Sequence, residues 1–412
     1  MSPQVAYGRR VRAGGALVAA AACLLAAARP LSAQGRLVGT RSASLGPVYE
    51  TWSFADPVQQ STFDNAGNAR VTGASQWSVP IGVVVPLGTR WSFDLSGAFA
   101  SGQVDLEGTD PSLDTDGYAL SGLTDVKLRL TGPLAGDNVL VTLGLNVPTG
   151  KTELDAEELS ALRVLAAPAL SFQTPALGTG LGGTTGIVLA RQFGGWAWAF
   201  GASYEFRGKY NPVAALQAGA GQSDFNPGDG VHLSLGADGL LGSHGMTLGL
   251  SADVFTTDKL TFTGDGASAE QSVKLGPVFS ADWQLRLATP RARELTLYAV
   301  DRYRSSFSQA GTAVEGSSGN YLDAGLRAVW GVSPSLGILT ALNARHQTGL
   351  SVDNSLATAA VAGGGATLGL VLGRGGATVQ PFLRAQAGQL DTGGDKTSIT
   401  GLAGGVSVGA TF

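Results

Sequence analysis

The strongest constraint in this sequence is an alternation of apolar and polar side chains with a period of two. The even positions of residues 196–207 are Trp196, Trp198, Phe200, Ala202, Tyr204 and Phe206, whereas the odd positions are small or charged. Because successive side chains of a β-strand point to opposite faces, such a segment has one apolar face and one polar face. The sequence therefore predicts strands along most of its length.

Several of these segments are longer than the strands of soluble sheets, which average about five or six residues. Residues 273–287 keep the alternation throughout, and residues 125–130 and 322–330 repeat it. A tilted strand needs roughly 9 to 11 residues to cross the hydrocarbon core of a membrane, with aromatic girdles at both interfaces. Trp91, Tyr210 and Tyr321 lie near predicted strand ends, as girdle residues do.

Sixteen segments carry this pattern, and short and long connections join them in turn. They are residues 45–54, 71–85, 90–106, 118–131, 138–148, 182–192, 196–210, 229–242, 245–262, 270–289, 292–307, 319–333, 335–349, 356–373, 376–390 and 398–412. Short turns on one side and longer loops on the other are typical of outer-membrane barrels, whose bacterial members have even strand numbers. Because 45–54 is a weak strand, the sequence predicts an all-β fold, a transmembrane antiparallel β-barrel of 14 to 16 strands.

Two details of this barrel need separate expectations. Pro80, Pro277 and Pro381 lie inside predicted strands, where the missing N–H favours a bulge or kink. The kink at Pro80 is also a candidate for an opening in the side of the barrel. In the longest loop, residues 153–165 have the leucine spacing of a short amphipathic helix, although a mobile acidic loop explains them equally well.

The two ends of the chain carry features of export and assembly. Residues 1–33 combine arginines, an apolar stretch and small residues at Ser32 and Ala33, which predicts a signal peptide cleaved after Ala33. Cys23, the single cysteine, lies in the apolar stretch, and a lipoprotein acceptor is the less favoured interpretation. The barrel domain then spans residues 34–412. Its last strand ends on Phe412, which resembles the signal read by the barrel assembly machinery.

Charge and composition narrow the partners. Residues 1–33 hold four arginines and no carboxylate, so the remaining chain has 23 Lys and Arg against 31 Asp and Glu, a formal net charge of −8. Nucleic acid is therefore not an expected partner. With 61 glycines and 14% charged residues, the chain suits strands that face lipid on one side. The expected partners are outer-membrane lipid, the assembly machinery and small solutes.

Two adjacent stretches resemble a known family. They run from Ser121 through Gly122-Leu123-Thr124-Asp125-Val126 to Leu130, and from Val141 through Asn146-Val147-Pro148-Thr149-Gly150 to Lys151. They look like a motif of the MetA-pathway phenol-degradation outer-membrane proteins, which are related to the FadL-like transporters of fatty acids and aromatic hydrocarbons. The resemblance covers about residues 118–212, including the strand that ends in Lys209-Tyr210-Asn211-Pro212. It implies uptake of hydrophobic or aromatic molecules through the barrel.

The sequence departs from FadL itself before the first strand. FadL has a plug there, whereas the segment from Gln34 to Leu45 is too short for one. If the family function carries over, a relay of substrate through that plug is either absent or replaced by loops that fold inward.

Face parity places many charged residues in the lumen. The candidates for setting selectivity are Lys127, Arg129, Glu205, Arg207, Asp282, Arg286, Arg302, Arg304, Arg327, Arg345 and Arg384. Both signs are present, so a structural network of ion pairs between strands is the simpler explanation for each of them. The alternative is a constriction that selects solutes, with the arginines at 302, 304, 327, 345 and 384 as an electropositive wall.

Catalysis and metal binding have little support in the sequence. His232 shares a predicted lumenal face with Ser234 and Asp238, but no nucleophile motif accompanies it. There is no paired histidine for a metal, no nucleotide-binding pattern and no expected cofactor; residues 105–116 are at most a loose calcium loop. We expect a channel for passive uptake in the outer membrane and no enzyme. The rivals are a structural or adhesive barrel with an occluded lumen and a lipid-modifying enzyme that uses His232.

Overall fold

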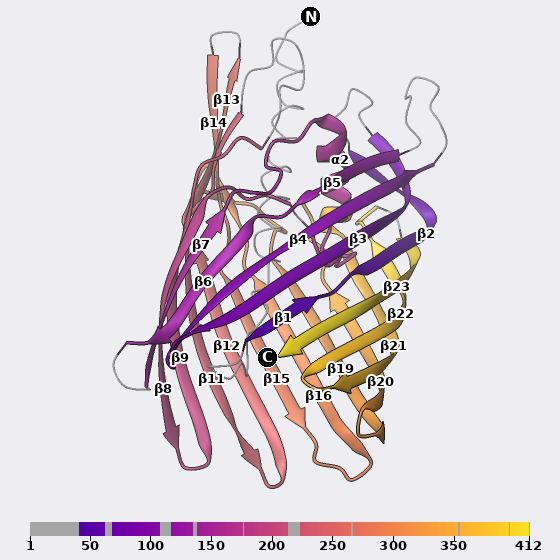
Figure 1. The fold of residues 1–412 in the computed structure, drawn as a ribbon. Coiled ribbons are helices and arrows are strands. Elements are labelled where there is room, and N and C mark those ends of the chain that lie inside the picture. Colours follow the sequence, from indigo (N-terminus) through magenta and orange to yellow (C-terminus); the bar gives the residue numbers. More distant parts are fainter. Residues whose placement is uncertain are drawn as a thin grey trace, which may run out of the picture.

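The computed structural model describes residues 41–61, 68–107, 117–134, 138–175, 177–212, 223–264, 267–352, 355–394 and 396–411. Their main sheet is antiparallel and closes on itself as a barrel of sixteen strand positions (Figure 1). The predicted fold class is confirmed, with the strand number at the upper end of the expected range. The predicted signal peptide and Phe412 lie outside the described residues.

The barrel strands pair in chain order. They are β2 (Val48–Ser61), β3 (Asn68–Leu87), β4 (Trp91–Leu106), β6 (Val126–Pro133), β7 (Val139–Val147), β8 (Gly182–Phe193), β9 (Trp196–Arg207), β11 (Gly230–Leu241), β12 (His244–Phe255), β15 (Val278–Arg286), β16 (Ala292–Arg304), β19 (Gly319–Ser333), β20 (Leu336–Gln347), β21 (Ala360–Arg374), β22 (Ala377–Asp391) and β23 (Lys396–Thr411). Two positions are each shared by two strands: β1 (Ser42–Leu45) extends β2, and β5 (Gly117–Leu123) extends β6. β23 pairs with β1 and β2, which closes the barrel.

The outer face of the barrel is apolar. Trp198, Phe200 and Leu250 are each more than two-fifths exposed, although they are large hydrophobic side chains. Their sequence neighbours, such as Ser251, point the other way, into the lumen, and pair there with Ser234 and Ser280. Exposed apolar side chains on the outer face of a closed barrel are the lipid-facing surface of a membrane-spanning barrel.

A second, smaller sheet rises above one side of the wall (Figure 1). It consists of β10 (Ser223–Asn226), β13 (Thr257–Gly264), β14 (Ala267–Lys274), β17 (Ser308–Gln309) and β18 (Thr312–Ala313). Phe225, Leu260, Val273 and Phe307 form its buried core. We call it the outer sheet. It is built from connections on the side of the barrel where the loops are long.

The outer sheet corrects two predicted strands. The segments 245–262 and 270–289 were expected to be continuous, but the chain leaves the wall at Thr256 and rejoins it after residues 275–277. Pro277 offers no N–H to a ladder. At Gly276 an added Cβ would lie 2.0 Å from the Ser305 carbonyl oxygen, so this position admits only glycine. These two residues interrupt the strand, although the alternation of apolar and polar residues continues through them in the sequence.

The other two prolines also lie where a ladder is interrupted. Pro80 stands opposite the break between β1 and β2, where its carbonyl accepts a 3.1 Å hydrogen bond from the Gly46 amide. On its other side β3 stays paired with β4 across Pro80 without a gap. The wall is therefore hydrogen-bonded on both sides of Pro80, and a side opening at this position stays a prediction. At Pro381 the register between β21 and β22 skips the residues opposite the proline.

The expected helix is present. α2 (Ala156–Leu165) begins at the N-cap Asp155, whose side chain accepts a hydrogen bond from the Glu158 amide, while the Glu158 side chain accepts one from the Asp155 amide. This reciprocal capping box explains why the acidic residues stand at the start of the helix. Among the described residues, no helix is long and apolar enough to cross a membrane.

Candidate functional site in the barrel lumen

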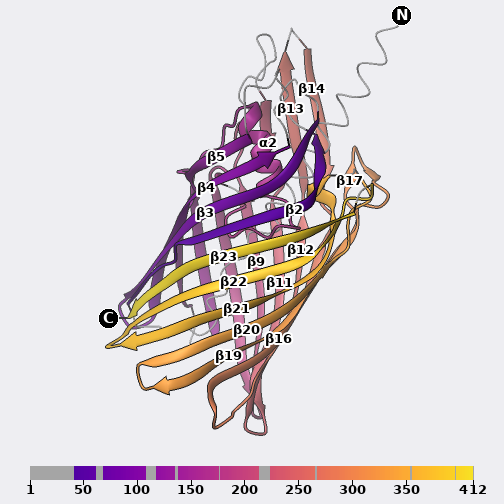
Figure 2. The same ribbon diagram turned by 90° about the vertical axis from the view of Figure 1, so that its right-hand side faces the viewer.

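The connection between β7 and β8 folds into the lumen. We call its described residues, 148–175 and 177–181, the plug. Leu165 of α2 packs so closely on β4 that a Cβ added to Gly102 would lie 2.4 Å from its Cδ1 atom. Leu159 and Val164 join Val104 and Tyr118 in one buried cluster with the lumenal faces of β2 to β5 and β21 to β23. Figures 1 and 2 both place α2 beside β4 and β5 at the upper end of the barrel.

Wall side chains hold the tip of the plug through its main chain. The Gln76 side chain pairs with both sides of Thr174, donating to its carbonyl at 2.8 Å and accepting from its amide at 3.1 Å. The Glu50 carboxylate accepts from the Gln173 amide at 3.0 Å. From β20, Arg345 donates to the Ala169 carbonyl at 2.7 Å. The main chain of the tip therefore finds its partners on β2, β3 and β20.

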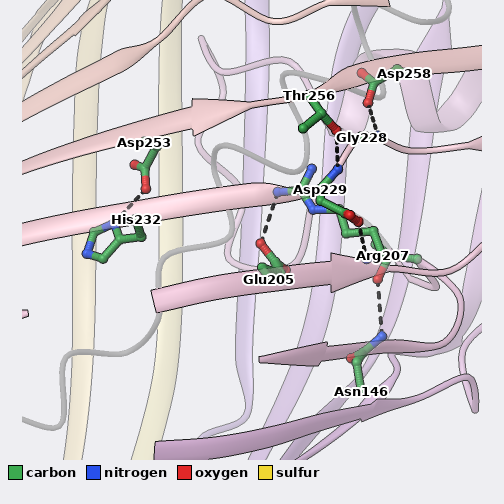
Figure 3. Close-up of polar contacts among 10 residues, drawn as sticks. Asn146, Glu205, Arg207, Gly228, Asp229, His232, Asp253, Thr256 and Asp258 are labelled. Carbon is green, nitrogen blue, oxygen red and sulfur yellow. Dashed lines mark hydrogen bonds and ion pairs between the residues drawn. The ribbon is translucent and has the colours of Figure 1, made fainter. Parts of the chain in front are cut away.

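The two ends of the plug meet at Asp125, in the break between β5 and β6. This carboxylate is 3% exposed. It accepts hydrogen bonds from the Gly150 amide at 2.9 Å, from the Thr179 amide at 2.7 Å and hydroxyl at 3.1 Å, and from Asn146 Nδ2 at 2.9 Å. Asn146, labelled in Figure 3, also donates to the Gly180 carbonyl at 2.6 Å. The predicted strand 118–131 is thus divided between β5 and β6, and the break places Asp125 against both ends of the plug.

The opposite half of the lumen is lined by small and polar side chains. Ser203, Ser234, Ser251 and Ser280 lie on the lumenal faces of β9, β11, β12 and β15, and all four are partly accessible. In contrast, the lumenal residues of β2 to β5 under the plug are buried. The lumen is therefore packed along one side and accessible along the other.

His232 and Asp253 stand in the accessible half, with His232 Nδ1 2.5 Å from Asp253 Oδ1 (Figure 3). Ser203 is the cross-strand neighbour of His232, so a serine, a histidine and an aspartate lie in one row. Within the described residues, however, no hydrogen bond joins Ser203 or Ser234 to His232. The described part of the chain also has no group of three or more His, Cys, Asp or Glu that could hold a metal ion.

The eleven predicted residues alternate along their strands with side chains of the outer face, and the role in selectivity stays a prediction. The structure gives several of them partners. Arg327 pairs with Glu294, Arg384 with Glu50, and Arg345 holds the plug. Arg327, Arg345 and Arg384 of the expected electropositive wall are therefore occupied in structural contacts. Lys127 and Arg286 are exposed in the lumen.

Arg207 and Glu205 belong to a polar cluster where the outer sheet joins the barrel (Figure 3). Arg207 Nη2 lies 3.0 Å from Glu205 Oε2, and the Arg207 amide donates to Asp229 Oδ1 at 3.1 Å. At the start of β13, Asp258 Oδ1 accepts a 2.5 Å hydrogen bond from the Gly228 amide. Burial of Asp258 raises the pKa of this carboxyl to about 6, although the Gly228 amide and the Arg207 charge oppose the shift.

Sequence reasoning missed Gln76, Ser78 and Glu50 as contacts of the plug, and it did not assign Asp125 a role beyond a lumenal face and a motif. Ser78 Oγ donates to Gln173 Oε1 at 3.2 Å. The available signal was a pair of polar residues in β3, Gln76 and Ser78, on either side of Trp77.

Comparison with known proteins gives likenesses of structure only. No protein-family model matches the chain, and no curated protein matches it. Similar solved structures are outer-membrane channels, FadL-like and hydrocarbon channels among them. A FadL homologue of Pseudomonas aeruginosa has 11% identity, a TM-score of 0.42 and 90% coverage of both chains.

Two further channels are similar over most of the chain. The CymD monoaromatic hydrocarbon channel has 10% identity and a TM-score of 0.41, and the match covers 91% of this chain and 89% of CymD. An outer membrane channel from Pseudomonas putida F1 has 13% identity and a TM-score of 0.37, with 93% and 99% covered. At this level of likeness we transfer neither a substrate nor a mechanism. The barrel itself rests on the strand pairing of this chain.

Proposed function

We propose that this protein is an outer-membrane channel for the passive uptake of small molecules, hydrophobic aromatic molecules included, and that it is not an enzyme. The observation that supports a channel is the uneven lumen: a plug packs one side, while Gly, Ser and Thr leave the other side accessible. A lumen lined by small side chains leaves room for a solute, and its charges tune which solutes pass.

The aromatic substrate class has a separate basis. It rests on the motif around Asp125 and Gly150, which resembles that of the phenol-degradation outer-membrane proteins. The name of the CymD channel states the same class for that protein. The proposed location follows from the predicted signal peptide together with the apolar outer face of the barrel. As further partners we propose the lipid around that face and the assembly machinery, which would read the last strand.

A structural barrel with an occluded lumen is the second candidate. The buried cluster under the plug favours it, because this cluster fills one side of the lumen completely. The two candidates differ in what crosses the membrane. A lipid-modifying enzyme remains third, and His232→Ala should then abolish lipid hydrolysis while the barrel still folds.

Reconstitution of the mature protein in liposomes tests the proposal. We expect uptake of a monoaromatic hydrocarbon, followed by an enclosed solvatochromic dye, to exceed the uptake by protein-free liposomes. Planar-bilayer recordings of the same preparation report passage of ions. Ion conductance without aromatic uptake would retain the channel and remove the aromatic substrate class. The absence of both ion flow and aromatic uptake would favour the structural barrel.

A further inference from the structure

The plug is fastened in two different ways. Its tip is held by side chains of the wall, and in residues 156–175 no strand pairing ties it to the barrel. Its two ends are held together by one buried carboxylate, Asp125, through Gly150 and Thr179, and by a 3.1 Å hydrogen bond from the Gly178 amide to the Lys151 carbonyl. Hydrogen bonds to an ionised acceptor are roughly twice as strong as those between neutral groups. Charged side chains hold the tip as well, at Glu50 and Arg345, but Asp125 differs from them in joining the two ends of the plug to each other.

Glycines surround this attachment. A Cβ added to Gly150 would meet three main-chain atoms of Leu177, Asp125 and Gly178 within 2.8 Å. Gly180 has a φ of +80°, in the left-handed region that favours glycine. The two ends of the plug thus approach each other and Asp125 at main-chain distance.

We propose that Asp125 is a positioning residue that keeps the plug in the lumen, and that the position of the plug sets the open cross-section of the channel. This rests on the proposed function of passive passage. When the carboxylate is removed, the ends separate, the plug shifts away from the wall, and the packed side of the lumen joins the accessible side.

The first test is single-channel conductance of the mature protein with Asp125→Ala. We expect open conductance to rise by roughly two-fold or more, since the plug covers one side of the lumen. Asp238→Ala is the matched control, because it removes one lumenal carboxylate from the accessible side, where Asp238 only accepts a 3.4 Å contact from Thr247. Conductance of the control should change by much less. Equal changes in both variants would show an effect of lumenal charge and overturn the proposal.

A reversible crosslink provides the second test. A Cβ on Gly122 would lie 3.5 Å from Lys151 Cβ, which is within the range for a disulfide. Cys23, the only native cysteine, lies in the predicted signal peptide, so it should not interfere. In Asp125→Ala with Gly122→Cys and Lys151→Cys, oxidation should restore the wild-type conductance and reduction should raise it again. If the redox state has no effect on conductance, the base of the plug does not control the opening.

Trypsin reports the position of the plug without any current. Arg163 of α2 is 5% exposed, so the wild-type protein should resist cleavage there and Asp125→Ala should be cut. If Asp125→Ala does not fold, Asp125→Asn, which keeps one acceptor oxygen, takes its place. Faster cleavage with unchanged conductance would overturn the gating step and leave the channel intact. If no variant conducts, both the channel and the gate are overturned, whereas cleavage still reports whether Asp125 holds the plug.

Discussion

Arg345 of β20 and Ala169 of the plug are joined by a 2.7 Å hydrogen bond from the guanidinium Nη2 to the main-chain carbonyl. The same guanidinium also contacts the Ser171 hydroxyl and lies 5.8 Å from the centre of the Trp52 ring. One cation thus links the tip of the plug to an aromatic residue on β2. Arg345 therefore holds the plug in place through these contacts and does not face solute as a free charge.

Arg345→Met should loosen the tip of the plug. The methionine fills similar space but leaves the Ala169 carbonyl without its donor, and an unsatisfied buried acceptor costs about 1 to 3 kcal/mol. We expect faster hydrogen exchange in residues 166–174. Arg327→Met is the control, because its partner Glu294 and Arg327 itself are both more than a third exposed, and such pairs contribute about 0 to 1 kcal/mol. Similar exchange in both variants would contradict this role of Arg345.

Gly150→Ala should disturb the base of the plug without removing any charge. The added methyl would meet only main-chain atoms, at 2.7 to 2.8 Å, so the chain itself has to move. Overpacking of this kind costs typically about 1 to 3 kcal/mol. We expect a lower midpoint in urea unfolding from liposomes and easier tryptic cleavage of the plug. Gly409→Ala, where no atom lies within 4 Å of the added Cβ, should behave as the wild type.

The barrel could be predicted because the alternation reports directly on the two faces of a strand. Leu250 and Ser251 show this, since neighbours in sequence contact lipid and lumen respectively. Asp125 could not be predicted in the same way. Its partners Gly150 and Thr179 lie 25 and 54 positions away, and only the folded plug brings them to one carboxylate. The alternation also runs through Gly276 and Pro277, where the chain passes from the outer sheet back into the wall.

The two faces of β12 give a direct test of the membrane-spanning barrel. Leu250→Arg places a charge on the lipid-facing side, which costs about 2 to 4 kcal/mol near the bilayer midplane. We expect it to fold poorly into liposomes, as followed by the loss of the heat-modifiable band on gels. Ser251→Arg puts the same side chain into the accessible half of the lumen, so it should fold and lower the conductance to cations. Normal folding of Leu250→Arg would contradict the assignment of the outer face.

Asp258 should make the outer sheet more stable in acid than at neutral pH. Its folded pKa of about 6 lies above the ordinary value of 3.8 because the carboxyl is buried. Between these values the folded protein binds more protons than the unfolded one, so the stabilisation is complete below 3.8 and is lost as the pH rises through about 6. Asp258→Asn stays neutral and still accepts from the Gly228 amide, so it should keep the acid-state stability at neutral pH.

Hydrogen exchange of residues 257–264 and 267–274, corrected for the intrinsic rate at each pH, measures this effect. Wild-type protection should fall between about pH 4 and about pH 7.5, whereas protection in Asp258→Asn should not. Asp224→Asn is the control within the outer sheet, because Asp224 pairs with Lys209 at 2.7 Å with both side chains about half exposed. Its protection should fall with pH as in the wild type, since the buried carboxyl is still present. A pH dependence that survives in Asp258→Asn would assign the effect to another group.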